Sequence, residues 1–240
     1  MNRRPASRTR AAARAGRAPR PDAALVARVM DTLDSLVEAY DLPAVEKITE
    51  EHRADAFRVL IGTMLSARTQ DATTDAASRR LFARARTPRT MAALRVSAIE
   101  RLIYPVSFYR NKARHVRAAS RLVTARFGGR VPATMDELLS LPGVGRKTAN
   151  LVLIVAHGSP DNICVDTHVH RITNRLGWVA TRTPEETEQA LYRAIDRRWW
   201  SRINLYLVTW GQRVCRPIGP RCRACAIRAL CPQIGVEARA

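Results

Sequence analysis

The residue type with the most distinctive chemistry in this sequence is lysine, because the chain contains so little of it. The 41 basic residues include only three lysines, Lys47, Lys112 and Lys147. A deprotonated amine is a good nucleophile, whereas the guanidinium of arginine keeps its proton. A position that retains lysine in so arginine-rich a chain therefore indicates a need for an amine. Lys147 is the clearest case, because Arg146 beside it already supplies a positive charge.

A second group with chemical potential is a set of four cysteines near the C-terminus. Their spacing is C-x6-C-x2-C-x5-C, formed by Cys215, Cys222, Cys225 and Cys231. The N-terminus lacks the apolar stretch of a secretory signal, so we expect a reducing compartment, where disulfides are rare. Thiolates packed this densely predict a metal site, and the spacing alone leaves a zinc ion and a cubane iron–sulfur cluster open. Cys164 lies outside the set, and we expect it to be a small buried residue.

The formal net charge of +20 is confined to particular parts of the chain. Residues 1–20, 101–130 and 197–236 hold many bases and no acid, whereas the remainder is close to neutral. Such segments suit a polyanionic partner, since each neutralised phosphate releases a bound counterion. Nucleic acid is the first expectation and an acidic membrane surface the second. The alternative without a function is a solvated, arginine-rich surface.

Residues 1–22 consist mainly of Arg, Ala and Pro without apolar periodicity, so we predict a disordered basic arm. A mitochondrial transit peptide has a similar composition, but Pro5, Pro19 and Pro21 would interrupt its amphipathic helix. The longest unbroken apolar run, Leu151 to Ala156, is too short to cross a bilayer, so we expect no membrane partner.

Beyond the arm, the sequence pattern is helical. Apolar residues recur at spacings of three and four from Leu25 to Val37. Helix starts are marked by Thr134 with Glu137, read as a capping box, and by Thr183 followed by Pro184. We find no convincing alternating strand pattern, and the predicted fold class is all-α.

One segment joins a leucine-rich helix to an apolar one through a turn with two glycines. Glycines allow positive φ and close approach of the backbone to another molecule. The free N–H groups at the start of the next helix suit a phosphate oxygen, although an ordinary tight turn would need the same glycines. The whole string resembles the DNA-binding helix-hairpin-helix of the endonuclease III family of DNA glycosylases: Leu141-Pro142-Gly143-Val144-Gly145-Arg146-Lys147-Thr148-Ala149-Asn150.

This resemblance assigns the chemistry. The segment Val165-Asp166-Thr167-His168 is similar to the VDTH segment of the family. It implies that Lys147 attacks C1′ of the sugar and that Asp166 assists, a reasonable pairing for cleavage of an N-glycosidic bond. His168 and His170 are two residues apart and cannot share one helix face as metal ligands. We expect His168 to be a hydrogen-bonding neighbour of Asp166 or a phosphate contact.

The resemblance also implies residues that fill the gap left by a flipped base. Segments 64–71 and 104–112 resemble the gap-filling loops of the family, with Arg68 and Phe108 at the inserting positions. Core packing is the alternative for Phe108. The family usually has Gln where this chain has Arg68 and Gly where it has Ser107, so we expect a changed reading of the opposite base.

The resemblance extends from Ala23 to Ile234 and implies two helical lobes. Residues 52–158 are expected to form a six-helix barrel lobe with the helix-hairpin-helix at about 134–157. A segment at 23–51 and a C-terminal part at 159–240 are expected to form a lobe with a 4Fe-4S cluster bound by the four cysteines. The cluster loop, residues 215–231, would present three bases to the DNA backbone: Arg216, Arg221 and Arg223.

The sequence therefore predicts a base-excision-repair enzyme. We expect a bifunctional DNA glycosylase and AP lyase that removes oxidised pyrimidines from double-stranded DNA, acting as a monomer in the bacterial cytoplasm at the nucleoid. An adenine- or thymine-mismatch glycosylase is the nearest alternative, although those families generally lack the lysine. A cluster-bearing DNA-binding protein without activity and a zinc-bearing DNA-binding module are alternatives from other classes.

Overall fold

The computed structural model describes residues 21–37, 39–40, 42–45, 47 and 55–236. Within these residues every regular element is helical and no strand occurs, which confirms the all-α prediction. None of the described helices is long and apolar enough to cross a membrane. The predicted basic arm at 1–22 lies almost entirely outside the described residues.

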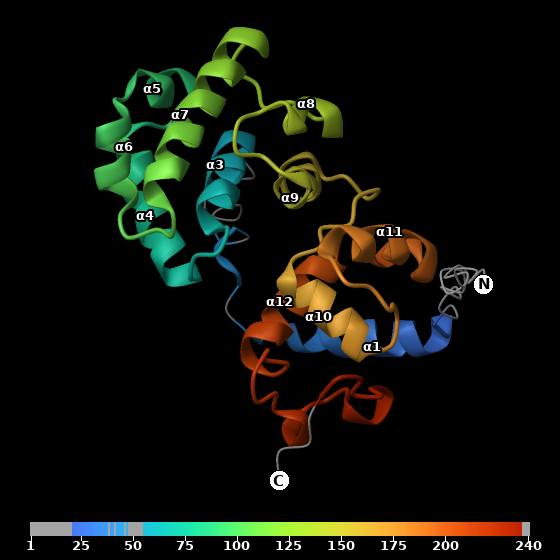
Figure 1. Cartoon of the computed structure of the whole chain (residues 1–240). Helices are drawn as coiled ribbons and strands as arrows, with labels where there is room; N and C mark the ends of the chain where they lie inside the picture. The colour runs from blue at the N-terminus through green and yellow to red at the C-terminus, as the bar shows by residue number, and fades with distance from the viewer. Residues whose placement is uncertain (1–20, 38, 41, 46, 48–54, 237–240) are drawn as a thin grey trace, which may run out of the picture.

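The helices divide between two hydrophobic cores (Figure 1). The first lobe, at the upper left of the figure, contains a core with Leu60, Leu81, Ile99, Val116 and Leu138 among its fully buried side chains. Its helices are α3 (Ala56–Ser66), α4 (Asp71–Arg84), α5 (Pro88–Ala93), α6 (Val96–Ile103), α7 (Tyr109–Arg126), α8 (Met135–Leu139) and α9 (Arg146–His157).

The second lobe brings together helices from opposite ends of the chain. Its core joins Val29 and Leu33 of α1 with Trp178, Trp199 and Trp210 from the C-terminal third. The elements are α1 (Ala23–Val37), α10 (Thr167–Arg175), α11 (Pro184–Ala194), α12 (Ile203–Arg213) and the 3-10 turns η1 (Arg197–Trp199), η2 (Cys222–Ala224) and η3 (Arg228–Leu230). In Figure 1, α1 runs beneath α10 and α12, and the chain after α12 lies below them.

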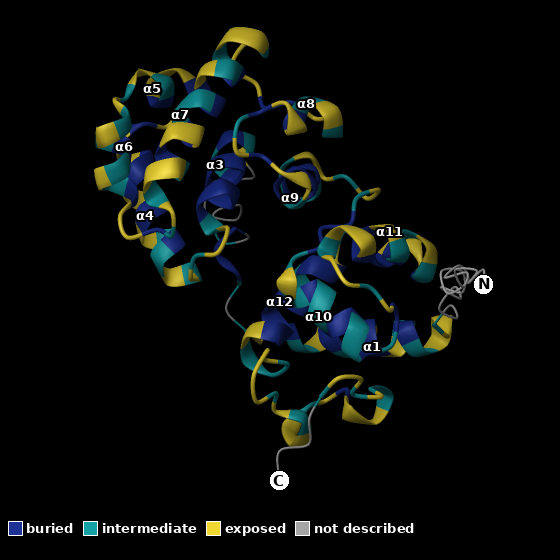
Figure 2. Ribbon diagram, viewed as in Figure 1, coloured by how far each residue is buried: buried dark blue, intermediate teal, exposed yellow. Residues whose placement is uncertain are grey.

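The two cores meet where the chain passes from one lobe to the other. Cys164 is fully buried in the first core, as expected for a small apolar residue, whereas Ile163 and Val165 on either side are buried in the second. Val45 belongs to the predicted 23–51 segment but packs into the first core. Figure 2 shows the result, with buried residues inside each lobe and exposed ones along the outer helix faces.

The two predicted helix starts have different outcomes. Thr183 caps α11 as expected, since its side chain accepts a hydrogen bond from the N–H of Glu186 at 3.1 Å and Pro184 follows it. The capping box at Thr134 is wrong, because the Thr134 side chain accepts no backbone N–H. Its hydroxyl donates instead to Oε2 of Glu137 at 2.7 Å, so the two side chains bond each other rather than the backbone.

Candidate active site and DNA interface

The hairpin between α8 and α9 needs glycine at Gly143 for two reasons. The residue has φ of 80°, in the left-handed region, and a Cβ there would lie 2.7 Å from the Cβ of His115 on α7. Gly145 is different, because its φ is −104° and its missing side chain leaves open space. The expectation of positive φ is therefore wrong for Gly145, whose small size instead leaves the start of α9 uncovered.

The start of α9 has unsatisfied backbone donors. No side chain caps this helix, and Gly143, Gly145 and Arg146 are exposed. The positive end of the helix dipole and the first N–H groups are therefore accessible to an anion. Val144 and Thr148 are buried, so any contact that these two residues make with DNA has to come from the backbone.

Arg146 is engaged within the protein. Its guanidinium makes two hydrogen bonds to the Glu188 carboxylate on α11, Nη2 to Oε1 at 2.5 Å and Nε to Oε2 at 3.2 Å. The Glu188 side chain is only 4% exposed, and this bond raises the pKa of Arg146. The ion pair fastens the start of α9 to the second lobe. Phosphate contact by Arg146, as predicted from sequence, would have to use the exposed part of a guanidinium that is already paired.

Lys147 and Asp166 stand at the starts of two helices, one from each lobe. Oδ1 of Asp166 caps α10 by accepting the N–H groups of His168 at 2.8 Å and Val169 at 2.9 Å. Oδ2 of Asp166 and the ammonium of Lys147 have no hydrogen-bond partner or ion pair within the described residues. The Cys164 thiol, two residues before Asp166, donates to the carbonyl of Lys147 at 3.5 Å. The charges of Asp166 and Lys147 both act on the His168 ring, which places the two predicted catalytic residues near each other.

His168 lies beside this site and is half-buried. Burial lowers its pKa, and its Nδ1 is 3.1 Å from Nη2 of Arg171. The expected hydrogen bond to Asp166 exists, but it comes from the His168 backbone rather than from the ring. The other histidine, His170, bonds Thr187 on α11 at 2.6 Å. The two rings therefore have separate partners.

The two predicted gap-filling residues share an unusual backbone conformation. Arg68 follows α3 and Phe108 precedes α7, and each has φ of 57°. Both side chains are exposed, with Phe108 at 61%, which excludes core packing for that ring. Non-glycine residues in the left-handed region cost roughly 1–3 kcal/mol and persist where the surroundings hold them. The two loops touch, because the N–H of Ser107 donates to Oγ1 of Thr69 at 3.2 Å.

Lys112 joins the same loops from the first turn of α7. Its Nζ donates to the carbonyls of Leu65 at 2.7 Å and Ala67 at 2.6 Å, and to Oγ1 of Thr69 at 3.2 Å. Burial, and to a lesser extent the positive charge of nearby Lys147, lowers the pKa of Lys112 from 10.5 to about 8. The three acceptors favour the charged form, so the ammonium predominates at neutral pH.

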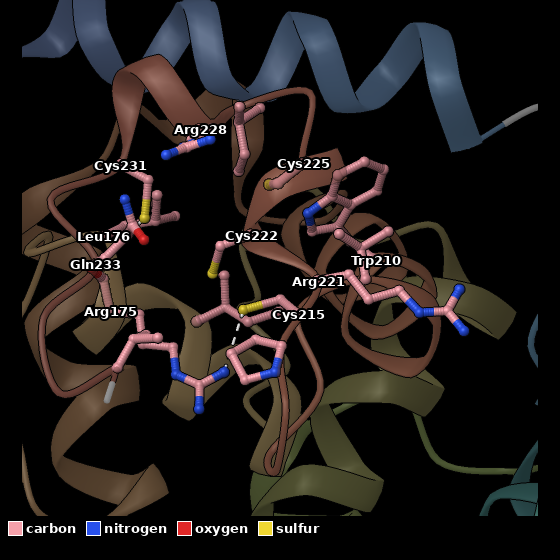
Figure 3. A pocket seen from close by; sticks show the side chains of 15 residues that line it. Arg175, Leu176, Trp210, Cys215, Arg221, Cys222, Cys225, Arg228, Cys231 and Gln233 are labelled. Atoms are coloured by element: carbon pink, nitrogen blue, oxygen red, sulfur yellow. Dashed lines mark hydrogen bonds between the residues drawn. The ribbon is translucent and has the colours of Figure 1, made fainter. Parts of the chain in front are cut away.

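The four C-terminal cysteines surround one pocket beneath the second lobe. Figure 3 shows their side chains around it, and all five cysteines of the chain are free of disulfides. No three His, Cys, Asp or Glu side chains among the described residues converge as the ligands of a single ion would. The thiols instead line a shared cavity with Trp210, whose buried indole N–H is directed at the Cys225 sulfur and favours the thiolate form of that residue. A sulfur-rich group bound by four thiolates would fit this lining and keep a sulfur acceptor for that N–H.

Arginines from α10 hold the start of the cysteine loop. Arg175 donates from Nη1 to the Cys215 sulfur at 3.3 Å and to the Arg216 carbonyl at 2.7 Å. Arg171 donates from Nη2 to the Cys215 carbonyl at 2.8 Å. The three bases predicted to face DNA are exposed on this loop: Arg216, Arg221 and Arg223.

Sequence reasoning missed three residues that shape the site. Glu188 gave no signal because a single acid on an amphipathic helix resembles any surface carboxylate, yet it is buried against Arg146. The sequence likewise gave no indication of the role of His115, whose side chain packs against Gly143. Lys112 did have a signal, since it is one of only three lysines in the chain.

Comparisons with a family model, with related sequences and with solved structures all indicate the same family. The model of the HhH-GPD superfamily, described as base excision DNA repair proteins, matches residues 61–197. Endonuclease III of Thermotoga maritima is 46% identical over 82% of this chain and 92% of its own length. A solved non-covalent endonuclease III–DNA complex is 34% identical, with a TM-score of 0.75 over 86% of this chain and 95% of that chain. A solved structure of a trapped endonuclease III–DNA covalent intermediate is also 34% identical. Its TM-score is 0.70, and the match covers 79% of this chain and 93% of that chain.

The family model covers more than half of this chain, and the Thermotoga relative extends the likeness across both lobes. The fold, the hairpin and the paired helix starts agree with this likeness. The chain therefore belongs to the endonuclease III family of the HhH-GPD superfamily, and it is a base-excision-repair DNA glycosylase of that family.

Proposed function

We propose that this enzyme removes oxidised pyrimidines from double-stranded DNA and then nicks the strand 3′ to the abasic site through a lysine Schiff base. The observation that carries the proposal is the Lys147 amine, which has no ion-pair partner within the described residues and lies in the same site as Asp166. The trapped covalent intermediate of the related endonuclease III supports a covalent route.

The first step breaks the N-glycosidic bond. Nζ of Lys147, once deprotonated, attacks C1′ and the bond to the base breaks, with the bonding electrons leaving on the base, which then takes up a proton. Oδ1 of Asp166 is occupied by two backbone N–H groups, so Oδ2 is the atom that faces developing positive charge at C1′ and accepts the proton from the attacking ammonium.

The second step depends on the protonated imine between Lys147 and C1′, which forms when the C1′–O4′ bond breaks and O4′ takes up a proton. Loss of a proton from C2′ breaks the C3′–O bond, and the 3′ phosphate leaves with the bonding electrons. Hydrolysis of the imine then regenerates the amine. An arginine cannot perform this sequence, because its guanidinium does not become a free nucleophile.

Phosphate binding at the hairpin orients the damaged strand. The uncapped start of α9 and the exposed backbone at Gly143 and Gly145 offer N–H donors to one phosphate. Phe108 and Arg68 enter the duplex where the flipped base was. Double-stranded DNA with a damaged base or an abasic site is therefore the proposed partner.

The four cysteines are proposed to hold a 4Fe-4S cluster. When bound, the cluster fixes the loop and adds redox chemistry that the steps above do not require. Cys215, Cys222, Cys225 and Cys231 are the proposed ligands, and the Trp210 N–H, which already interacts with Cys225, would then face a ligand sulfur. In this arrangement the loop bearing Arg216, Arg221 and Arg223 reaches the DNA backbone.

A panel of duplexes tests the substrate class. Each contains one lesion, such as thymine glycol, 5-hydroxycytosine, an A·G mismatch, a T·G mismatch or an abasic site, and base release and strand nicking are measured separately. We expect release and nicking on the oxidised pyrimidines. Release of mismatched adenine or thymine alone would assign the chain to a mismatch specificity, and binding without turnover on every duplex would contradict the proposal. Arg68→Gln, assayed in parallel, measures how far that residue sets the opposite-base preference.

A further inference from the structure

We infer that Lys112 is a positioning residue, one that fastens the Arg68 loop to the Phe108 loop so that both side chains enter the DNA gap as one unit. The inference rests on the proposed function, because it concerns how a flipped base is replaced. Lys112 itself does not touch DNA in this account and acts through the two loops.

The contacts of Lys112 converge on the first loop. The lysine belongs to the helix that follows Phe108, and all three of its acceptors lie between Leu65 and Thr69. Two of them are backbone carbonyls at the C-terminal end of α3, that of Leu65 in its last turn and that of Ala67 just after it. No further helical turn follows that could bond these carbonyls. Thr69 closes the connection, since its hydroxyl also accepts the Ser107 N–H. One cation and one hydroxyl thus join segments about 40 residues apart in sequence.

The strained backbone of the two loops requires contacts that hold it in place. Arg68 and Phe108 are non-glycine residues with φ of 57°, directly beside the bonded atoms of Ala67, Thr69 and Ser107. A left-handed non-glycine residue relaxes unless its neighbours are fixed on both sides. Arg80 of α4 holds the other end of the Phe108 loop, through hydrogen bonds to the carbonyls of Leu102 at 2.9 Å and Tyr104 at 2.5 Å. Unlike Arg80, Lys112 joins both inserting loops, and the hydrogen bond from Ser107 to Thr69 supports the same junction.

The geometry also explains why this position is lysine in a chain that uses arginine. An ammonium is a compact point with three N–H bonds directed apart, and it can meet three acceptors around one atom. A guanidinium is planar and longer, so its donors cannot converge on the same three acceptors. The ammonium uses all three protons in these bonds, which leaves no lone pair for attack. Lys112 therefore does not act as a nucleophile, as Lys147 is proposed to do, although the two positive charges are close.

The test measures gap filling without chemistry. All variants carry Lys147→Ala, and the duplex has 2-aminopurine opposite a tetrahydrofuran abasic analogue, whose fluorescence reports unstacking of the opposite base. With Lys112 intact we expect a full change at saturating protein. With Lys112→Met the saturated change should fall about fivefold or more, and Lys112→Arg should not restore it. Arg89→Met, which removes one exposed charge from the short helix α5, is the matched control and should keep the full change.

A second measurement separates this idea from the proposed function. In the background with Lys147 intact, borohydride trapping on a single-stranded abasic oligonucleotide requires no gap filling. We expect Lys112→Met to trap within about threefold of wild type there, yet to lose about 30-fold in single-turnover base release from a paired duplex. Failure of the wild type to trap at all would overturn the proposed function, while the fluorescence assay would still decide the role of Lys112.

Three results would overturn the inference. One is a full fluorescence change with Lys112→Met. Another is rescue by Lys112→Arg, which would show that only the positive charge matters. The third is an equal loss on single-stranded and paired substrates, which would place Lys112 in the chemistry itself. Thermal unfolding of each variant accompanies these assays. If Lys112→Met does not fold, Thr69→Val removes the shared acceptor from the same junction and should lower the saturated fluorescence change in the same way.

Discussion

Two regions of this molecule carry exposed side chains that we propose contact DNA from irregular backbone, and the two regions are held in different ways. The gap-filling loops, residues 64–71 and 104–112, are fastened by protein groups, above all the ammonium of Lys112. The cysteine loop, residues 215–231, contains two single-turn 3-10 helices and only one buried residue, Ile227. Its best-defined internal feature is the pocket lined by four thiols.

This difference indicates which part of the proposed DNA interface depends on the proposed 4Fe-4S cluster. Loops fixed by internal hydrogen bonds keep their shape whenever the fold is intact. The cysteine loop is held by Arg171 and Arg175 mainly at its start and has only one buried residue, so we expect the rest of it to gain order from what its thiolates bind. We therefore expect the gap-filling loops to be independent of the cluster and the cysteine loop to depend on it.

Within this comparison of the two regions, the largest expected effect comes from removing a proposed cluster ligand. Cys222→Ser should lose the visible absorbance of the cluster and make the four arginines of residues 215–231 rapid sites of trypsin cleavage. DNA affinity should fall about 100-fold as the loop arginines lose their placement. The 2-aminopurine signal at saturating protein should remain, because the gap-filling loops have their own fastening.

Cys164→Ala is the matched control for the cluster, since this buried thiol lies in the other core. It should leave iron content and the trypsin pattern unchanged. A Cys222→Ser protein that keeps its iron and its resistance to trypsin would contradict the dependence of this loop on the cluster. Loss of the saturated fluorescence signal in Cys222→Ser would contradict the independence of the other loops.

A smaller effect is expected from the strained residue at the wedge. Phe108→Ala and Phe108→Gly both remove the ring and should lower base release from a paired duplex about tenfold. Glycine tolerates φ of 57°, so Phe108→Gly should be more stable than Phe108→Ala by about 1 kcal/mol. Denaturant unfolding of the two variants measures this difference. Equal stabilities would show that Lys112 and its partners hold the loop under no strain.

The smallest effect concerns pH. Burial and nearby Lys147 lower the pKa of Lys112 from 10.5 to about 8. The Lys112 amine is therefore fully protonated well below pH 8 and loses its proton as the pH rises through that value. The neutral amine has only two protons for three acceptors. We expect the ratio of activity on paired over single-stranded abasic substrate to decline about threefold between pH 7 and pH 9. A pH effect on the chemical step itself acts on both substrates and cancels in the ratio.

Lys112→Met supplies the control for this decline. Its ratio should be low and independent of pH over the same range. A wild-type ratio that stays constant from pH 7 to pH 9 would mean that the charge of Lys112 does not govern the loops.

Much of this arrangement was predictable from sequence because it depends on local signals. Helical periodicity and the absence of a strand pattern predicted the fold class, and the hairpin string and VDTH segment indicated Lys147 and Asp166 as the proposed catalytic pair. The spacing of four cysteines predicted a shared site. Each of these is a property of a short segment read by itself.

The remainder depends on contacts between distant segments, which no local pattern reveals. The pairing of Arg146 with Glu188 joins positions 42 residues apart and engages a side chain predicted to bind phosphate. The predicted Thr134 capping box does not form, because the Thr134 and Glu137 side chains bond each other instead of the backbone. Lys112 was visible as a rare residue type, yet its purpose emerges only when its three acceptors on the other loop are known.

The most direct test of the central claim is borohydride trapping on an abasic duplex with wild type, Lys147→Ala and Lys147→Arg. We predict a covalent protein–DNA adduct for wild type and a yield lower by about 1,000-fold for both variants. Lys147→Arg should still bind DNA, because its positive charge remains. An adduct of similar yield in Lys147→Ala would contradict the account, since another amine would then perform the chemistry.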